Sequence, residues 1–436
     1  MATIEDFTKH PAVLQAVDKA QAACHGKAIS DLVDGNNLQY VDLVMEGGGV
    51  LGIALTGYTY VLEQAGIRFL GIGGTSAGSI NALMIAALGP PEEAKSEHLL
   101  RVLAEMPMAA FIDGDQDARD FSRAALGKVG MAKLLWKALQ VVDNFTDELG
   151  LNPGTKFFEW LTDQLGRAGV RTNADLLNRL KTVPRGLHLR ANRTDTTLRD
   201  DDAFGRLIMV AADITTETKV EFPRMAELYW ADPAEVNPAC FARASMSIPF
   251  FFHPFRVDGC PQDPARWKAL ADYEGQPPEH VLFMDGGIMS NFPINLFHQP
   301  YRVPTSPTFG AKIGIDREQP AVISKPSQLL GAVFDAARHT LDFDFISRNP
   351  DYKHLVAMID TGDHNWLDFT MADQAKLDLF ARGAQAAAKF LCEFNWEKYK
   401  TIRKGIAEAF LASQNHTDDS AELLGNGNRM EAAPVS

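Results

Sequence analysis

Apolar runs of strand length alternate with helical patterns from residue 41 onward. Residues 41–45 form a short apolar run, and a glycine-rich turn follows it. Apolar side chains then recur at helical spacing over residues 53–65. A second apolar run, residues 67–72, leads through a sharp turn into a helical pattern over residues 79–88. This stretch therefore predicts two consecutive strand–helix units.

The same patterns predict the remaining elements of the chain. Residues 1–37 are expected to be a helical extension, with one apolar face formed by Val13, Leu14, Val17 and Ala20. Further helices are predicted for residues 92–106, 131–143, 155–167, 172–180, 235–244, 327–345, 371–391 and 394–412. Further strands are predicted for residues 187–192, 207–213, 219–222, 281–284 and 355–360. A surface loop is expected over residues 259–278, and a disordered tail over residues 413–436.

Composition narrows the class of protein. The chain has 436 residues, of which 46% are apolar, enough for one large core or two modest ones. A net charge of −14 argues against a nucleic-acid partner and against general attraction to an anionic membrane. The 4 cysteines form no C-x-x-C pair, which suits a reducing compartment. Because no signal peptide or long apolar run is visible, the sequence predicts a cytoplasmic protein.

The glycine-rich turn is compatible with more than one chemistry. Gly47, Gly49 and Gly52 satisfy the G-x-G-x-x-G pattern of dinucleotide-binding proteins. That interpretation requires an acidic residue near the end of the second strand, but residues 70–73 contain none. A Walker loop also fails, since no Gly-Lys-Ser/Thr follows. The glycine pattern alone is therefore a weak signal for nucleotide binding.

Acyl transfer from a serine explains residues 41–88 better than nucleotide binding does. Gly74, Ser76 and Gly78 form a G-x-S-x-G sequence between a strand and a helix, as in a nucleophile elbow. The amides and dipole at the start of that helix would face developing negative charge. The backbone N–H groups of Gly48 and Gly49, with Gly47 as a further candidate, would then bind the oxyanion.

Spacing and a third motif give a family resemblance. The glycine loop and the elbow are separated by one helix and one strand, and Asp285-Gly286-Gly287 follows a strand much later in the chain. These three motifs, in this order, resemble the patatin-like phospholipases. The segments 207–223 and 243–255 also resemble that family, and the similarity extends over about residues 38–391.

The resemblance implies a fold and a domain organisation. The expected fold is a three-layer α/β/α domain with a mostly parallel central sheet, over residues 38–393. A mostly helical insertion, residues 92–200, follows the helix after the nucleophile. It would either cap the site or only cover one face of the sheet.

The resemblance also implies an activity: hydrolysis of lipid carboxylic esters by a Ser76–Asp285 dyad without a catalytic histidine. A lone carboxylate is a weak base for an alcohol, so Asp285 should be desolvated and without a cationic partner. Gly286 and Gly287 would allow close approach of the two turns, and Gly52 close packing of the first helix. The mechanism needs no cofactor and no metal. The partner would be a lipid or lysolipid ester, with room for transient contact with a membrane surface.

The chain departs from the family pattern in two respects. Many members carry Lys or Arg in or beside the glycine loop, where this chain has Val50 and Leu51. If that cation holds phosphate, this protein would favour neutral acyl esters or lysophospholipids over diacyl phospholipids. Glu46 stands before the glycines, where Asp is common.

Several alternatives remain open at this stage. His364 could complete a Ser-His-Asp triad, because the order Ser76, Asp285, His364 fits an α/β-hydrolase. The chain could also be a weakly catalytic binding or effector protein on the same fold. Two further segments carry alternative interpretations: residues 250–252 with Phe255 as a lipid-contacting lip or a buried segment, and residues 200–202 as a solvated loop or a calcium ligand set.

Overall fold

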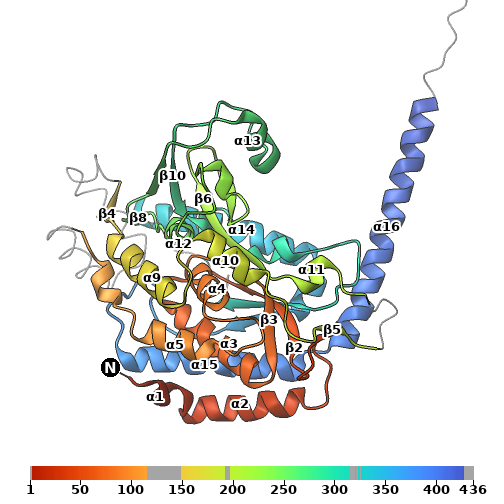
Figure 1. The fold of residues 1–436 in the computed structure, drawn as a ribbon, viewed down its shortest axis with the longest axis horizontal. Helices are drawn as coiled ribbons and strands as arrows, with labels where there is room; N and C mark the ends of the chain where they lie inside the picture. The colour runs from red at the N-terminus through yellow and green to blue at the C-terminus, as the bar shows by residue number, and fades with distance from the viewer. Residues whose placement is uncertain are drawn as a thin grey trace, which may run out of the picture.

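The computed structural model describes residues 2–114, 149–191, 197–314, 320, 323–324 and 326–426. Its framework is a 10-stranded mixed sheet whose main path runs β12-β11-β2-β3-β6-β10-β9 (Figure 1). The parallel strands are β2 (Gln39–Met45), β3 (Ile67–Thr75), β6 (Arg206–Asp213), β11 (Thr308–Ile313) and β12 (Val356–Ile359). The antiparallel strands are β1 (Leu32–Val33), β5 (His188–Leu189), β7 (Thr218–Phe222), β9 (Phe255–Asp258) and β10 (His280–Asp285). A separate pair joins β4 (Gly150–Asn152) to β8 (Phe250–Phe252).

The centre of this sheet is covered on both faces. β2 and β3 are buried along almost their whole length, as expected for apolar strands with helices on either side. Successive residues of a strand point to opposite faces. A Cβ on Gly73 would meet the Phe297 ring, whereas a Cβ on Gly74 would meet the Gly78 backbone in α4 (Ala77–Ala87). The protein therefore has the three-layer α/β/α architecture that the sequence predicts.

One helical layer is built around α3 (Gly52–Gln64) and α15 (Asp373–Glu393), which pack against each other. A Cβ on Gly57 would lie 2.0 Å from the Phe380 carbonyl oxygen, and one on Gly383 would lie 1.8 Å from the Ala54 carbonyl oxygen. Each glycine thus lets the other helix's backbone approach closely. α2 (Pro11–Cys24) packs against both helices, and α1 (Ile4–Thr8) precedes it (Figure 1).

The other face is covered by short 3₁₀ turns and one long helix. These are η5 (Pro293–Phe297), η6 (Pro350–His354) and α14 (Pro326–Arg348). The remaining helices and turns are η1 (Gly49–Leu51), α5 (Ser96–Ala104), η2 (Met108–Phe111), α9 (Thr155–Arg167), α10 (Asn173–Leu180), α11 (Asp200–Ala203), η3 (Ala226–Leu228), α12 (Ala239–Ser245), α13 (Pro264–Ala271), η4 (Gly286–Ile288) and α16 (Trp396–Asn426). In the described part of the chain, no helix is both long and apolar enough to cross a membrane.

Several predicted elements differ from the observed ones. The expected surface loop at 259–278 contains α13, because Asp263 caps the helix and Trp267 is fully buried. Leu14, expected on an apolar face with Val13, is 49% exposed because only part of that face meets the core. The strand expected at 187–192 is limited to β5. The helix expected at 131–143 lies outside the described residues.

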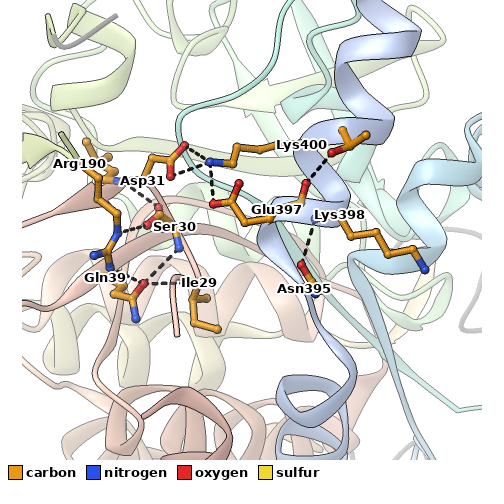
Figure 2. A network of polar contacts seen from close by, with 11 residues as sticks. Ile29, Ser30, Asp31, Gln39, Arg190, Asn395, Glu397, Lys398 and Lys400 are labelled. Carbon is orange, nitrogen blue, oxygen red and sulfur yellow. Dashed lines mark hydrogen bonds and ion pairs between the residues drawn. The ribbon is translucent and has the colours of Figure 1, made fainter. Parts of the chain in front are cut away.

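The C-terminal helix is anchored at its start by a polar network (Figure 2). Lys400 of α16 lies 3.0 Å from Asp31, a carboxylate with no solvent exposure, and 3.0 Å from Glu397. Arg190 donates to the Ser30 carbonyl at 2.9 Å and to the Gln39 side chain at 2.9 Å. α16 continues to Asn426, beyond the helix end that the sequence predicts near residue 412.

Candidate active site

Ser76 occupies the sharp turn between β3 and α4. Its backbone has φ 52° and ψ −118°, a conformation that residues with a side chain rarely adopt. The glycines on either side are required by packing, since a Cβ on Gly74 would lie 2.3 Å from the Gly78 carbonyl carbon. A Cβ on Gly78 would lie 2.2 Å from the Met45 carbonyl oxygen. The G-x-S-x-G sequence thus forms a strained elbow at the start of a helix.

Asp285 meets this elbow from β10, which runs antiparallel to β6. The Ser76 hydroxyl donates a hydrogen bond to Asp285 Oδ2 at 2.6 Å, and each residue is 4% exposed. The other carboxylate oxygen accepts the Gly287 N–H at 2.8 Å. A Cβ on Gly286 would lie 2.0 Å from the Val210 carbonyl oxygen, so this turn also needs glycine. The structure therefore brings the two predicted turns into direct contact.

The environment of Asp285 changes its proton affinity. Burial raises the pKa of Asp285 above its ordinary value. The guanidinium of Arg338, the Ser76 hydroxyl and the Gly287 N–H act in the opposite direction and lower that pKa. The carboxylate is desolvated, as expected from the sequence. The expectation that it lacks a cationic neighbour is wrong, because α14 places Arg338 close to it.

The glycine loop lies directly beside the elbow. The Gly47 N–H donates to the Asn291 carbonyl at 3.0 Å, so this amide is occupied and is removed from the expected oxyanion donors. Within the described residues, the N–H groups of Gly48 and Gly49 have no hydrogen-bond partner. Gly49 has φ +54°, and a Cβ there would lie 2.1 Å from the Trp366 carbonyl oxygen. A Cβ on Gly52 would meet the Ala77 Cβ at 3.2 Å, so Gly52 allows close packing of α3 on α4.

One segment that carries no predicted site residue supports both members of the pair. Ser245 Oγ accepts the Ser76 N–H at 2.9 Å and donates to the Val210 carbonyl at 2.6 Å. The Ser247 carbonyl accepts the Asp285 N–H at 2.8 Å. Both serines belong to the segment 243–255, whose resemblance to the family was the available sequence signal.

An apolar cavity of about 40 Å³ opens beside the Ser76 hydroxyl. Residues of the insertion form part of its lining, namely Met106, Met108, Phe111 and Phe157. The rest of the lining, apart from Ser76, is formed by Gly49, Val50, Ala77, Ile80, Met246, Ile248 and Phe369. The insertion thus contributes side chains to the wall of the site. Such a lining suits a hydrocarbon chain.

His364 does not join this pair. Its Nε2 lies 2.9 Å from Asp378 Oδ2, and no histidine in the described ranges hydrogen-bonds to Ser76 or Asp285. The geometry therefore matches a two-residue arrangement rather than the triad alternative.

The structure also bears on the two segments that carried alternative interpretations, residues 250–252 and 200–202. Phe251 is fully buried and stacks on Phe369 at 4.7 Å, so the buried interpretation of residues 250–252 holds for this side chain. Asp202 is 3% exposed and accepts the Thr305 hydroxyl at 2.6 Å, which contradicts the solvated-loop interpretation there. Among the residues that the structure describes, no group of three or more His, Cys, Asp or Glu side chains is arranged to hold a metal ion.

Comparison with known proteins places this geometry in context. The family model described as patatin-like phospholipase matches residues 43–298, which is more than half of the chain. A protein of Bacillus subtilis (strain 168), named "Uncharacterized protein YqhO", is 27% identical over 361 residues, covering 82% of this chain and 100% of that protein. The crystal structure of VipD from Legionella pneumophila covers 93% of this chain and 85% of its own, with 12% identity and a TM-score of 0.39.

Proposed function

The chain belongs to the patatin-like phospholipase family, and from that premise we propose that it hydrolyses lipid carboxylic esters with Ser76 as nucleophile and Asp285 as general base. The observation that carries the proposal is the 2.6 Å hydrogen bond from Ser76 Oγ to Asp285 Oδ2 at a strained, buried elbow. A serine hydroxyl needs a base within hydrogen-bonding reach to act as a nucleophile at neutral pH.

The reaction proceeds in two steps. Asp285 takes the hydroxyl proton as Ser76 Oγ bonds to the ester carbonyl carbon, and the carbonyl oxygen becomes an oxyanion. When the carbon–oxygen bond of the alcohol breaks, the proton on Asp285 passes to the leaving alkoxide, and an acyl-serine remains. A water molecule then attacks the acyl carbon as Asp285 takes one of its protons; the bond between the acyl carbon and Ser76 Oγ breaks, Asp285 returns the proton to Ser76 Oγ, and the carboxylic acid leaves.

The oxyanion would bind to the N–H groups of Gly48 and Gly49. Both amides lack a partner within the described residues, in contrast to the Gly47 amide. The start of α4, directly after Ser76, adds the positive end of a helix dipole. Removing one such donor typically lowers kcat by about 10²- to 10³-fold.

The lining of the cavity favours a neutral acyl group. Val50 contributes an apolar side chain at a position where many family members have a cation. The cation near the site, Arg338, donates to the Gly47 carbonyl and the Asn291 side chain, and it does not line the cavity. We therefore propose a preference for neutral acyl esters or lysophospholipids over diacyl phospholipids.

Covalent labelling combined with hydrolysis assays tests this function. Wild type is expected to react with a fluorophosphonate probe and to hydrolyse p-nitrophenyl butyrate, and Ser76→Ala to do neither. Ser306→Ala, at a serine just before β11, serves as the matched control and should behave as wild type. The absence of labelling and of hydrolysis in wild type, across neutral esters, lysophospholipids and diacyl phospholipids, would instead support a binding role.

A further inference from the structure

Three segments far apart in the sequence meet at Gly47. Its carbonyl oxygen accepts hydrogen bonds from Asn291 Nδ2 at 3.1 Å and from Arg338 Nη2 at 3.1 Å. The same Arg338 nitrogen donates to Asn291 Oδ1 at 3.0 Å. The Gly47 N–H donates to the Asn291 carbonyl at 3.0 Å. Both backbone polar groups of Gly47 are therefore held, and Arg338 closes a triangle with Asn291 and Gly47.

This triangle fixes the direction of a neighbouring amide. The Gly47 carbonyl and the Gly48 N–H belong to one peptide unit, which is trans, so they point in opposite directions. With its carbonyl bound by Asn291 and Arg338, this peptide directs the Gly48 N–H away from them. Glycine on both sides leaves the peptide few steric barriers to rotation. Its orientation therefore depends on the groups that bind the carbonyl.

We propose that Arg338 is a positioning residue that holds the Gly47–Gly48 peptide in the orientation that presents the Gly48 N–H to the oxyanion. The proposal rests on the proposed function, since the oxyanion arises only in that reaction. Arg338 acts through the peptide and does not line the substrate cavity. A flipped peptide would direct a carbonyl oxygen, a partial negative charge, to the place where an N–H is needed.

Arg338 is itself held at the other end of the glycine loop. Its guanidinium lies 5.2 Å from the centre of the Trp366 ring, and the Trp366 carbonyl accepts the Val50 N–H at 2.9 Å. A charged donor forms a stronger hydrogen bond to a carbonyl than a neutral donor does. A lysine at this position would retain the charge but lose the planar, stacked donor group.

The test compares Arg338→Gln, Arg338→Lys and the matched control Arg348→Gln. Arg348 lies on the same helix, is well exposed and pairs with Asp344. Each variant is assayed for kcat and KM with p-nitrophenyl butyrate, and for inhibition by an alkyl trifluoromethyl ketone. The ketone forms an adduct in which Ser76 Oγ bonds to the carbonyl carbon, and this adduct carries an oxyanion.

We expect Arg338→Gln to lower kcat by about 10²-fold, the effect of losing one oxyanion donor, with KM little changed. Affinity for the ketone should fall by the same factor as kcat/KM, Arg338→Lys should recover part of both, and Arg348→Gln should match wild type. If Arg338→Gln does not fold, the same comparison is made with Arg338→Lys. Its affinity for the ketone should fall by the same factor as its kcat/KM.

Unchanged ketone affinity in the Arg338 variants would overturn the positioning role, and so would a raised KM at constant kcat. These outcomes are separate from failure of the proposed function, which would appear as an inactive wild type.

Discussion

The hydroxyl of Ser76 donates to the carboxylate of Asp285 at 2.6 Å across 209 positions of sequence. Ser76 directly follows the last residue of β3, Asp285 is the last residue of β10, and β6 lies between these two strands in the sheet. Asp285 pairs with Ala211 of β6, and Thr75 pairs with Val210 of the same strand. The pair is thus set by the register of three adjacent strands rather than by a flexible loop.

Loss of the Asp285 carboxylate should abolish most of the activity. Asp285→Asn cannot accept the Ser76 proton, so kcat/KM for p-nitrophenyl butyrate should fall by roughly 10²- to 10⁴-fold. His364→Ala is the contrasting variant, because His364 contacts Asp378. It should retain near-wild-type activity, and a near-total loss in His364→Ala would favour a triad instead.

The pH dependence of the reaction should reflect Asp285. Only its ionised form accepts a proton, so kcat/KM should rise with pH through an Asp285 pKa that burial raises above 3.8. Arg338→Gln removes the opposing positive charge, so the acid limb should move to higher pH. Arg243 of α12 donates to Ser247, whose carbonyl accepts the Asp285 N–H, and Asp342 of α14 accepts the Ser290 hydroxyl; both residues are unchanged in Arg338→Gln. An unmoved acid limb in Arg338→Gln would argue against this electrostatic contact.

The same raised pKa has a consequence for stability. A carboxyl whose folded pKa is raised contributes stability below its unfolded pKa, and that contribution is lost as pH rises through the folded pKa. At pH 7, Asp285→Asn should therefore unfold at higher denaturant concentration than wild type. The difference between the two should shrink as pH falls toward 4, and an Asp285→Asn that is less stable at pH 7 would contradict this.

Phe111 should limit the length of the acyl chain. Its ring packs 5.4 Å from the Phe157 ring at the wall of a cavity of only about 40 Å³. Phe111→Leu should raise kcat/KM for octanoate relative to butyrate esters by about 10-fold, since one methylene in an apolar pocket is worth roughly 10- to 200-fold. Phe222→Leu, at a fully buried ring on β7, controls for general loosening of the core. Equal chain-length profiles in both variants would show that the cavity does not select chain length.

Lys400 should stabilise the junction between α16 and the N-terminal segment. Lys400→Met leaves the fully buried Asp31 carboxylate without this cation, and we expect a loss of about 3 kcal/mol in the free energy of unfolding. Lys398→Met, at an exposed position two residues earlier, should change it by less than about 0.5 kcal/mol. Denaturant titration measures both, and equal midpoints would mean that the buried pair adds nothing net.

Local sequence predicted the parts of the site that depend on backbone constraints. The elbow around Ser76 and the turn after Asp285 both require glycine where another backbone approaches within van der Waals distance, and glycines are visible in a sequence. Helix α9 was predicted with its exact bounds, because its apolar positions follow a clear helical period.

The remaining site residues could not be predicted because they act across tertiary contacts. Arg338 lies in the predicted helix 327–345, but nothing in the sequence indicates that this helix and Trp366 reach the glycine loop. The same is true of the hydrogen bond that occupies the Gly47 amide, which depends on the position of the Asn291 carbonyl. α13 was missed because its helical signal is short and lies among prolines, while burial of Trp267 stabilises it.

The close glycine contacts between α3 and α15 affect where the chain can be truncated. The family match ends at residue 298, yet β11 and α15 lie beyond it. β11 pairs with β2, the strand that leads into the glycine loop, and α15 covers the helix that follows the loop. A fragment ending at residue 298 would leave a bare strand edge and an uncovered helix beside the nucleophile, and it should aggregate rather than retain the activity.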